Sequence, residues 1–186
     1  KPGHLVRQDA DVQVRQADHP YVGRGALKLV HALDTFGIAC EGRDALDIGA
    51  STGGFTDVLL RRGAAHVVAI DVGHNQMDWR LRSDPRVTCL ERINARYLTA
   101  DALPPGRRAF DIVTADVSFI SLRYILPVVP PLLRPGADVV TLVKPQFEAG
   151  RDEVGQGVVR DEGVRQRVLA EIIGAAEELG LTAVGH

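Results

Sequence analysis

Lysine is rare in this chain, and two of its lysines stand where side chains could perform chemistry. Of the 22 basic residues 19 are arginine, and the three lysines are Lys1, Lys28 and Lys144. Lys144 follows directly after an apolar run, as does Asp116. Taken singly, Asp116 could be a helix cap and Lys144 a surface residue beside a proline. Because lysine, unlike arginine, can lose its proton, the pair together with Lys28 predicts a catalytic group.

A glycine-rich turn is the second chemical feature. It reads Asp-Ile-Gly-Ala-Ser-Thr-Gly-Gly-Phe-Thr over residues 47–56 and leads from an apolar run into a helical pattern. Glycines allow the backbone to approach a ligand closely. Asp71 ends the next apolar run, 24 residues after Asp47. A carboxylate at that distance is placed to bind the two ribose hydroxyls of an adenosine-type cofactor.

The spacing of the glycines argues against a dinucleotide as that cofactor. Dinucleotide binding requires G-x-G-x-x-G, so that a pyrophosphate can sit on the helix N-terminus, whereas this turn reads G-x-x-x-G-G. S-adenosylmethionine carries no phosphate. Its sulfonium, amino and carboxylate groups suit the backbone of such a turn together with a nearby acid. The pattern therefore predicts a methyl-donor site.

A regular alternation of strands and helices positions these residues. The pattern predicts strands over residues 44–48, 66–71, 87–91, 110–115, 138–143 and 181–184, and helices over 26–36, 54–62, 76–82, 122–126 and from 161 onward. Nearly continuous apolar strands alternating with helices are typical of a parallel sheet covered on both faces. The predicted fold is a doubly wound, Rossmann-like α/β domain. Ligands of such sheets bind at the carboxyl ends of the strands, where Asp71, Asp116 and Lys144 stand.

Composition excludes several classes of protein. The chain has 186 residues, 45% of them hydrophobic and 25% charged, which indicates one globular domain. The longest stretch without a charged residue is only ten residues, 124–133, with three prolines, so no transmembrane helix is expected. Two isolated cysteines, Cys40 and Cys89, argue against a disulfide framework and a zinc site, and they suit a reducing, cytoplasmic compartment.

The net charge of −2 conceals a basic segment. Residues 61–108 contain nine arginines against five acids. These arginines could be an ordinary solvated surface, or a face that binds nucleic-acid phosphates.

Four ordered motifs resemble one family. They are YVGRGALKL at 21–29, DIGASTGGFT at 47–56, ADVSFIS at 115–121 and LVKPQFE at 142–148. Together they resemble the FtsJ-like ribose 2′-O-methyltransferases, most closely the TlyA family, often labelled hemolysin A. The resemblance implies that S-adenosylmethionine is the cofactor and that ribosomal RNA, at the 2′-hydroxyl of cytidines, is the substrate and partner. It also implies a Lys-Asp-Lys-Glu tetrad, whose first three members fall on Lys28, Asp116 and Lys144, with the fourth expected beyond residue 186.

The resemblance and the residue types together assign roles. Lys144 is the candidate base that removes the 2′-hydroxyl proton, Lys28 is expected to position the ribose or its phosphate, and Asp116 to orient both lysines. The predicted cofactor-binding set is Asp47, Gly49, Ser51, Gly53, Gly54, Phe55, Asp71, Val72, Asn94 and Asp116, and no metal is expected. Asn94 could equally be a simple turn residue.

The resemblance also predicts a domain division. Residues 1–18 are expected to be the end of an S4-type RNA-binding domain with its linker, and residues 19–186 a methyltransferase domain that is incomplete at its C-terminal strands. RNA phosphates would meet arginines on the rim of the sheet, namely Arg80, Arg82, Arg86 and Arg92.

Two other functions fit the sequence less well. A base methyltransferase of the same fold commonly shows an Asn/Asp-Pro-Pro-aromatic run, but residues 116–119 read Asp-Val-Ser-Phe without proline. A membrane-lytic protein would need a basic amphipathic helix, whereas the clearly amphipathic helix from residue 161 is acidic.

Overall fold

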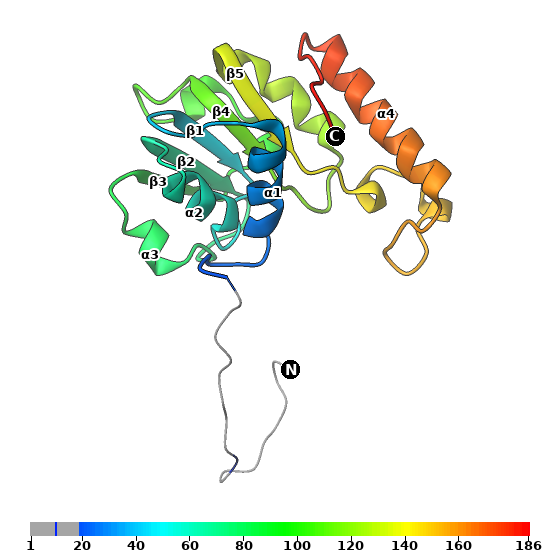
Figure 1. Cartoon of the computed structure of the whole chain (residues 1–186), viewed down its shortest axis with the longest axis horizontal. Helices are drawn as coiled ribbons and strands as arrows, with labels where there is room; N and C mark the ends of the chain where they lie inside the picture. Colours follow the sequence, from blue (N-terminus) through cyan, green and yellow to red (C-terminus); the bar gives the residue numbers. More distant parts are fainter. Residues whose placement is uncertain (1–9, 11–18) are drawn as a thin grey trace.

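A five-stranded parallel sheet forms the centre of the computed structural model, which describes Ala10 and residues 19–186 (Figure 1). The strand order is β3-β2-β1-β4-β5, and every neighbouring pair is parallel. The strands are β1 (Asp44–Ile48), β2 (His66–Asp71), β3 (Val87–Glu91), β4 (Phe110–Ala115) and β5 (Leu133–Thr141). This arrangement confirms the predicted doubly wound α/β fold.

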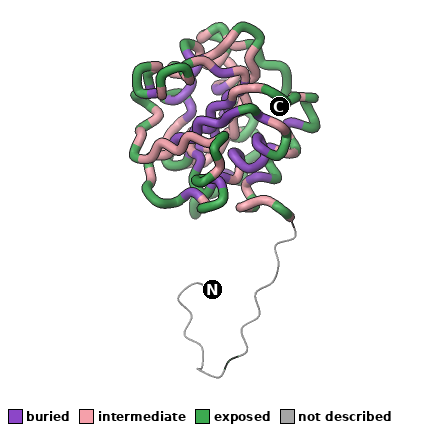
Figure 2. The backbone as a smooth tube through the Cα atoms, turned by 90° about the vertical axis from the view of Figure 1, so that its left-hand side faces the viewer, coloured by how far each residue is buried: buried purple, intermediate pink, exposed green. Residues whose placement is uncertain are grey.

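Strand register brings the carboxyl ends of the central strands to one level. Ile48 at the end of β1 pairs with Ile70 on β2 and with Ala115 on β4. Asp71 and Asp116 therefore emerge on either side of the glycine-rich turn. The central strands β1, β2 and β4 are almost entirely buried, as the central part of the tube in Figure 2 shows, whereas the edge strands β3 and β5 are only partly buried.

The two faces are covered by different kinds of structure. On one face lie α1 (Ala26–Phe36) and α2 (Gly54–Arg61), whose side chains Leu29, Leu33 and Val58 are buried against the sheet. The other face is covered by the 3₁₀ turns Leu122–Tyr124, Leu126–Val128 and Pro130–Leu132 and by α4 (Glu162–Glu178). Three prolines interrupt the 126–132 segment, which accounts for short turns in place of a helix.

Several predicted boundaries are corrected by the structure. The helix expected over 76–82 is only α3 (Trp79–Arg82), because the Asp78 side chain accepts a hydrogen bond from Arg80 N and begins the helix there. The helix expected over 122–126 is replaced by 3₁₀ turns. The strand expected over 138–143 begins earlier, at Leu133, and ends at Thr141.

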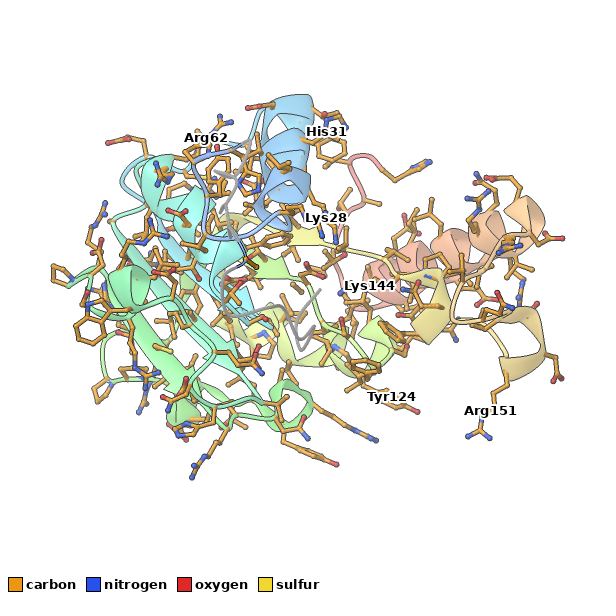
Figure 3. All side chains as sticks on the ribbon, turned by 90° about the horizontal axis from the view of Figure 1, so that it is seen from below. Lys28, His31, Arg62, Tyr124, Lys144 and Arg151 are labelled. Atoms are coloured by element: carbon orange, nitrogen blue, oxygen red, sulfur yellow. The ribbon has the colours of Figure 1, made fainter. Side chains whose placement is uncertain are left out.

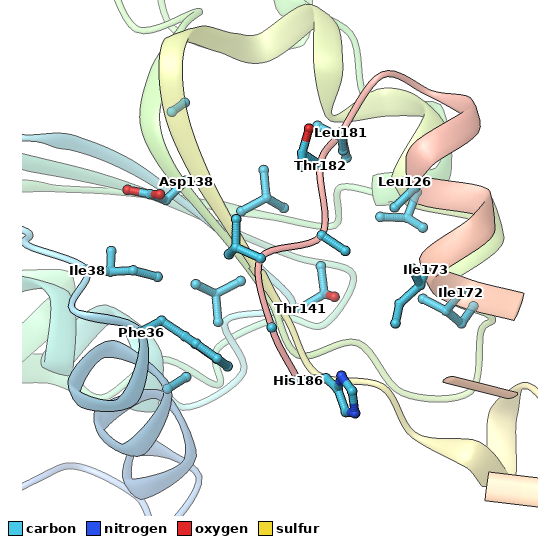
Figure 4. Close-up of a pocket in the computed structure, with 18 of the residues that line it drawn as sticks. Phe36, Ile38, Leu126, Asp138, Thr141, Ile172, Ile173, Leu181, Thr182 and His186 are labelled. Carbon is cyan, nitrogen blue, oxygen red and sulfur yellow. The ribbon is translucent and has the colours of Figure 1, made fainter. Parts of the chain in front are cut away.

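The prediction of a strand over residues 181–184 is wrong. These residues have no regular structure and pair with no strand of the described chain. Instead the 181–186 segment lines a cavity of about 750 Å³, together with α1, α4 and the edge strand β5 (Figure 4). Gly185 lies so near Phe36 that an added Cβ would be 2.6 Å from the ring.

The predicted S4-type tail, residues 1–18, lies outside the described residues except for Ala10. Within the described part of the chain, none of the helices has the length and apolar character needed to cross a membrane.

Candidate active site

Three residues of the glycine-rich turn after β1 have a left-handed backbone conformation. Gly49 has φ 83°, Ser51 49° and Gly53 96°. A Cβ on Gly53 would lie 2.3 Å from Leu81 Cδ1, and one on Gly49 would lie 3.0 Å from the Asp116 carbonyl oxygen. Glycine is thus required at both positions by conformation and by space.

Asp71 holds the turn as well as ending β2. Its carboxylate accepts hydrogen bonds from Ser51 N at 2.8 Å and from Gly73 N at 2.7 Å. A carboxylate has four acceptor positions, so Asp71 retains capacity for ligand hydroxyls.

Asp116 brings the two predicted lysines together. Lys144 Nζ forms an ion pair with Asp116 Oδ1, and Lys28 Nζ lies 3.9 Å from Asp116 Oδ2. Lys144 also donates a hydrogen bond to Ser118 Oγ at 2.8 Å. Lys144 is 16% exposed and Lys28 51% exposed, so Lys144 is the more enclosed of the two (Figure 3).

One carboxylate oxygen in this group keeps an open acceptor position. Asp116 Oδ1 is buried, and its contact with Lys144 is not aligned as a hydrogen bond. Among the described residues no other donor reaches this oxygen.

A single cavity of about 290 Å³ connects the glycine-rich turn with this charged group. Its lining consists of Gly23, Arg24, Gly25, Gly49, Ala50, Ser51, Thr52, Gly54, Phe55, Asp116, Ser118 and Lys144. The structure thus brings the predicted cofactor turn and two predicted catalytic residues to one space, as expected for the carboxyl ends of parallel strands.

A family model described as FtsJ-like methyltransferase matches residues 21–186. The chain belongs to the FtsJ-like methyltransferase family.

Several relatives agree with this assignment. The chain is 54% identical over 173 residues to the 16S/23S rRNA (cytidine-2′-O)-methyltransferase TlyA of Mycobacterium tuberculosis, covering 92% of this chain and 63% of the relative. It is 40% identical over 188 residues to Hemolysin A of Brachyspira hyodysenteriae, covering 98% of this chain and 75% of that protein. A solved structure of a protein named as a hemolysin, from Streptococcus thermophilus, has a TM-score of 0.87 and 44% identity and covers 92% of this chain and 62% of that one. The chain thus spans somewhat less than two thirds of the M. tuberculosis relative's length.

In this FtsJ-like chain Asp47 lies beneath the turn and not in the cavity. It is 0% exposed, and its two carboxylate oxygens accept hydrogen bonds from Thr56 Oγ1 at 2.7 Å and Thr114 Oγ1 at 3.0 Å. Burial disfavours the charged carboxylate and raises the pKa of Asp47 to about 6. The predicted cofactor residue therefore occupies a supporting position.

Four other predicted cofactor residues do not line the cavity either, namely Gly53, Asp71, Val72 and Asn94. Val72 is exposed directly after β2. The Asn94 side chain accepts a hydrogen bond from Arg96 N and so caps a 3₁₀ turn, which is the turn role left open by its sequence.

Three of the four rim arginines that were expected to bind RNA form ion pairs with neighbouring acidic residues of this chain. Arg80 pairs with Asp78, Arg82 with Glu91, and Arg86 with Asp84. Glu91 also accepts hydrogen bonds from Asn75 N and His74, and these contacts, led by that of Arg82, lower the pKa of Glu91 to about 2. The positive charge of these three arginines is therefore largely neutralised by neighbouring carboxylates.

Motif residues to which the sequence assigned no role include Arg24, Thr52, Ser118 and Phe119. The first three line the cavity. Phe119 is 91% exposed, has a left-handed φ of 63°, and its ring centroid lies 5.1 Å from that of Phe147. Ser118 and Phe119 follow Asp116 at the end of β4. Their position directly after an apolar run could have marked them as candidate site residues from the sequence alone.

Proposed function

We propose that this protein binds S-adenosylmethionine at the glycine-rich turn and methylates a ribose 2′-hydroxyl of ribosomal RNA. The observation that carries the proposal is the convergence of that turn with Asp116 and Lys144 around one cavity, with Lys28 Nζ 3.9 Å from Asp116 Oδ2. The name of the M. tuberculosis relative, which the chain matches at 54% identity, supports cytidine as the nucleotide. Ribosomal RNA as substrate would put the protein in the cytoplasm.

The residues of the turn fit the proposed cofactor. Close backbone approach is available at Gly49 and Gly53, and Asp71 has acceptor capacity for ribose hydroxyls. The buried Asp116 Oδ1, which lacks an aligned donor, suits a cationic ligand. When bound, S-adenosylmethionine would supply an electrophilic methyl group on its sulfonium.

The charged group accounts for the activation of the hydroxyl. A ribose 2′-hydroxyl is a weak nucleophile, so its proton must leave as it attacks. Lys144 lines the cavity beside the turn and accepts that proton in its neutral form. Asp116 holds Lys144 in place, while the more exposed Lys28 is free to meet the ribose or its phosphate.

The exposed aromatic ring next to this group supports a flipped-out RNA nucleotide as the substrate. Sequence-specific recognition of RNA targets unpaired nucleotides, whose splayed-out bases stack on aromatic rings. Phe119 offers such a ring, three residues after Asp116 and braced by Phe147. Arg24 lines the cavity and could bind the adjoining phosphate.

The test uses the full-length gene product, intact ribosomal subunits and S-adenosylmethionine labelled in its methyl group. Ribose methylation makes the adjoining phosphodiester resistant to alkali, because alkaline cleavage requires a free 2′-hydroxyl. We expect the label in alkali-stable dinucleotides. Label in mononucleotides would instead identify a base methyltransferase, and absence of label from RNA would overturn the proposal.

A further inference from the structure

The Ser118 hydroxyl is the neutral partner of Lys144. Lys144 Nζ donates to Ser118 Oγ at 2.8 Å while it also contacts Asp116 Oδ1. Both partners line the same cavity as Lys144. An ammonium group has three N–H bonds; the hydrogen bond to Ser118 uses one, and even if the Asp116 carboxylate takes a second, one is left for a third partner.

The backbone fixes where this hydroxyl lies. Phe119 has a left-handed φ of 63°, which is strained for an aromatic residue and turns the chain sharply after Ser118. On the other side, Pro145 restricts the backbone of Lys144 to an extended conformation. The two side chains are thus presented from two stiffened segments.

A carboxylate bridges these two segments. Glu148, four residues after Lys144, accepts hydrogen bonds from Ser121 Oγ at 2.5 Å and from Leu122 N at 2.8 Å. The segment after β5 is thereby tied to the segment after β4, and Phe147 packs against Phe119 between them. The distance between Ser118 and Lys144 is therefore set by the tertiary structure and not by the two side chains alone.

A hydroxyl and a carboxylate hold a lysine in different ways. Asp116, as an ionised acceptor, favours the charged ammonium form. A serine oxygen accepts a hydrogen bond from the ammonium and equally from an N–H of the neutral amine, whose single lone pair stays free. It can thus hold the side chain before and after proton transfer.

We propose that Ser118 is a positioning residue that holds Lys144 in both protonation states and directs the remaining position on its nitrogen, the lone pair of the neutral amine, toward the ribose 2′-hydroxyl. This inference rests on the proposed function. In the step itself, the lone pair of the neutral Lys144 amine takes the hydroxyl proton, the oxygen forms a bond to the methyl carbon, and the bond from that carbon to sulfur breaks. The products are the ammonium, the methyl ether and a neutral thioether.

The experiment compares Ser118→Ala, Ser118→Thr and the unchanged full-length gene product in ribose methylation of ribosomal subunits. We expect Ser118→Ala to lower kcat by about tenfold or more, the effect of losing one hydrogen bond to a charged group, with the KM for RNA and the Kd for S-adenosylmethionine changed by less than about twofold. Ser118→Thr retains the hydroxyl and should restore most of kcat. Ser83→Ala removes a hydroxyl that only caps α3 and serves as the control.

The outcomes separate this inference from the function on which it rests. No ribose methylation by the unchanged protein would overturn the proposed function. With an active unchanged protein, a kcat for Ser118→Ala equal to that of Ser83→Ala would overturn the role of Ser118. A fall in kcat that Thr does not restore, or a rise in KM or Kd alone, would also overturn it, because a residue that orients Lys144 must act on kcat through its hydroxyl.

Discussion

Ionisation of Asp47 beneath the glycine-rich turn should cost stability at neutral pH. The carboxyl group is 0% exposed, and its two hydrogen-bond partners are the neutral hydroxyls of Thr56 and Thr114. Neither hydroxyl compensates for the loss of water around a charge. Asp47→Asn keeps the size of the side chain and removes the charge, while the two hydroxyls can rotate to match an amide.

The size and sign of the effect follow from the pKa. Burial raises the pKa of Asp47 to about 6, whereas an unfolded aspartate titrates near ~3.9. Between these values the unfolded chain releases its proton while the folded protein keeps it, so the folded state loses stability as pH rises. A difference of about two pKa units corresponds to about 3 kcal/mol, present below pH ~4 and lost above pH ~6.

Urea unfolding of the wild type and of Asp47→Asn from pH 4 to pH 8 measures this cost. We expect the free energy of unfolding of Asp47→Asn, minus that of the wild type, to rise by about 2 kcal/mol between pH 4 and pH 7, because the carboxyl of the unfolded chain is already about half ionised at pH 4. A constant hydrogen-bond loss in the variant cancels in this comparison, and Asp101→Asn, at an exposed carboxyl, shows the effect of removing a solvated group. A difference that stays flat over the whole range would refute the reasoning.

Three further changes test the site. Asp71→Ala should weaken S-adenosylmethionine binding about 10- to 150-fold, because the ligand hydroxyls lose a charged acceptor and Ser51 N loses its hydrogen-bond partner. Calorimetry measures this affinity, and an unchanged value would show that Asp71 is not part of the binding site. Lys144→Arg should retain cofactor affinity and abolish methyl transfer, since a guanidinium does not deprotonate, and near-normal turnover would leave Lys144 only an electrostatic role. Phe119→Ala should lower methylation of ribosomal subunits at least tenfold with cofactor affinity unchanged, the value expected from lost base stacking. Trp79→Ala, at an aromatic residue that is 75% exposed on α3, is its control, and equal activities of the two variants would argue against a stacking role.

The strands were predictable from sequence because a buried parallel strand is an uninterrupted apolar run. Strands β1 to β4 lie at the predicted residues. β5 was predicted too short, because Arg134, Pro135 and Gly136 resemble a turn, yet Leu133 pairs with Phe110 across an irregularity in the ladder. The 181–184 segment shows the opposite error: its composition suits a strand, but a strand requires a neighbour with which to pair, and local sequence does not specify one.

Sequence alone determined which residues stand at the carboxyl ends of the strands, since the end of each apolar run is visible in the chain. Tertiary structure alone decided how those ends meet. It put Asp47 beneath the turn and not in the cavity, and it brought Ser118 within hydrogen-bond distance of Lys144, 26 residues away. It also paired Arg82 of α3 with Glu91 at the end of β3. Such contacts depend on strand order, register and the left-handed turns between elements, which are set by packing across the whole sheet and not by any local pattern.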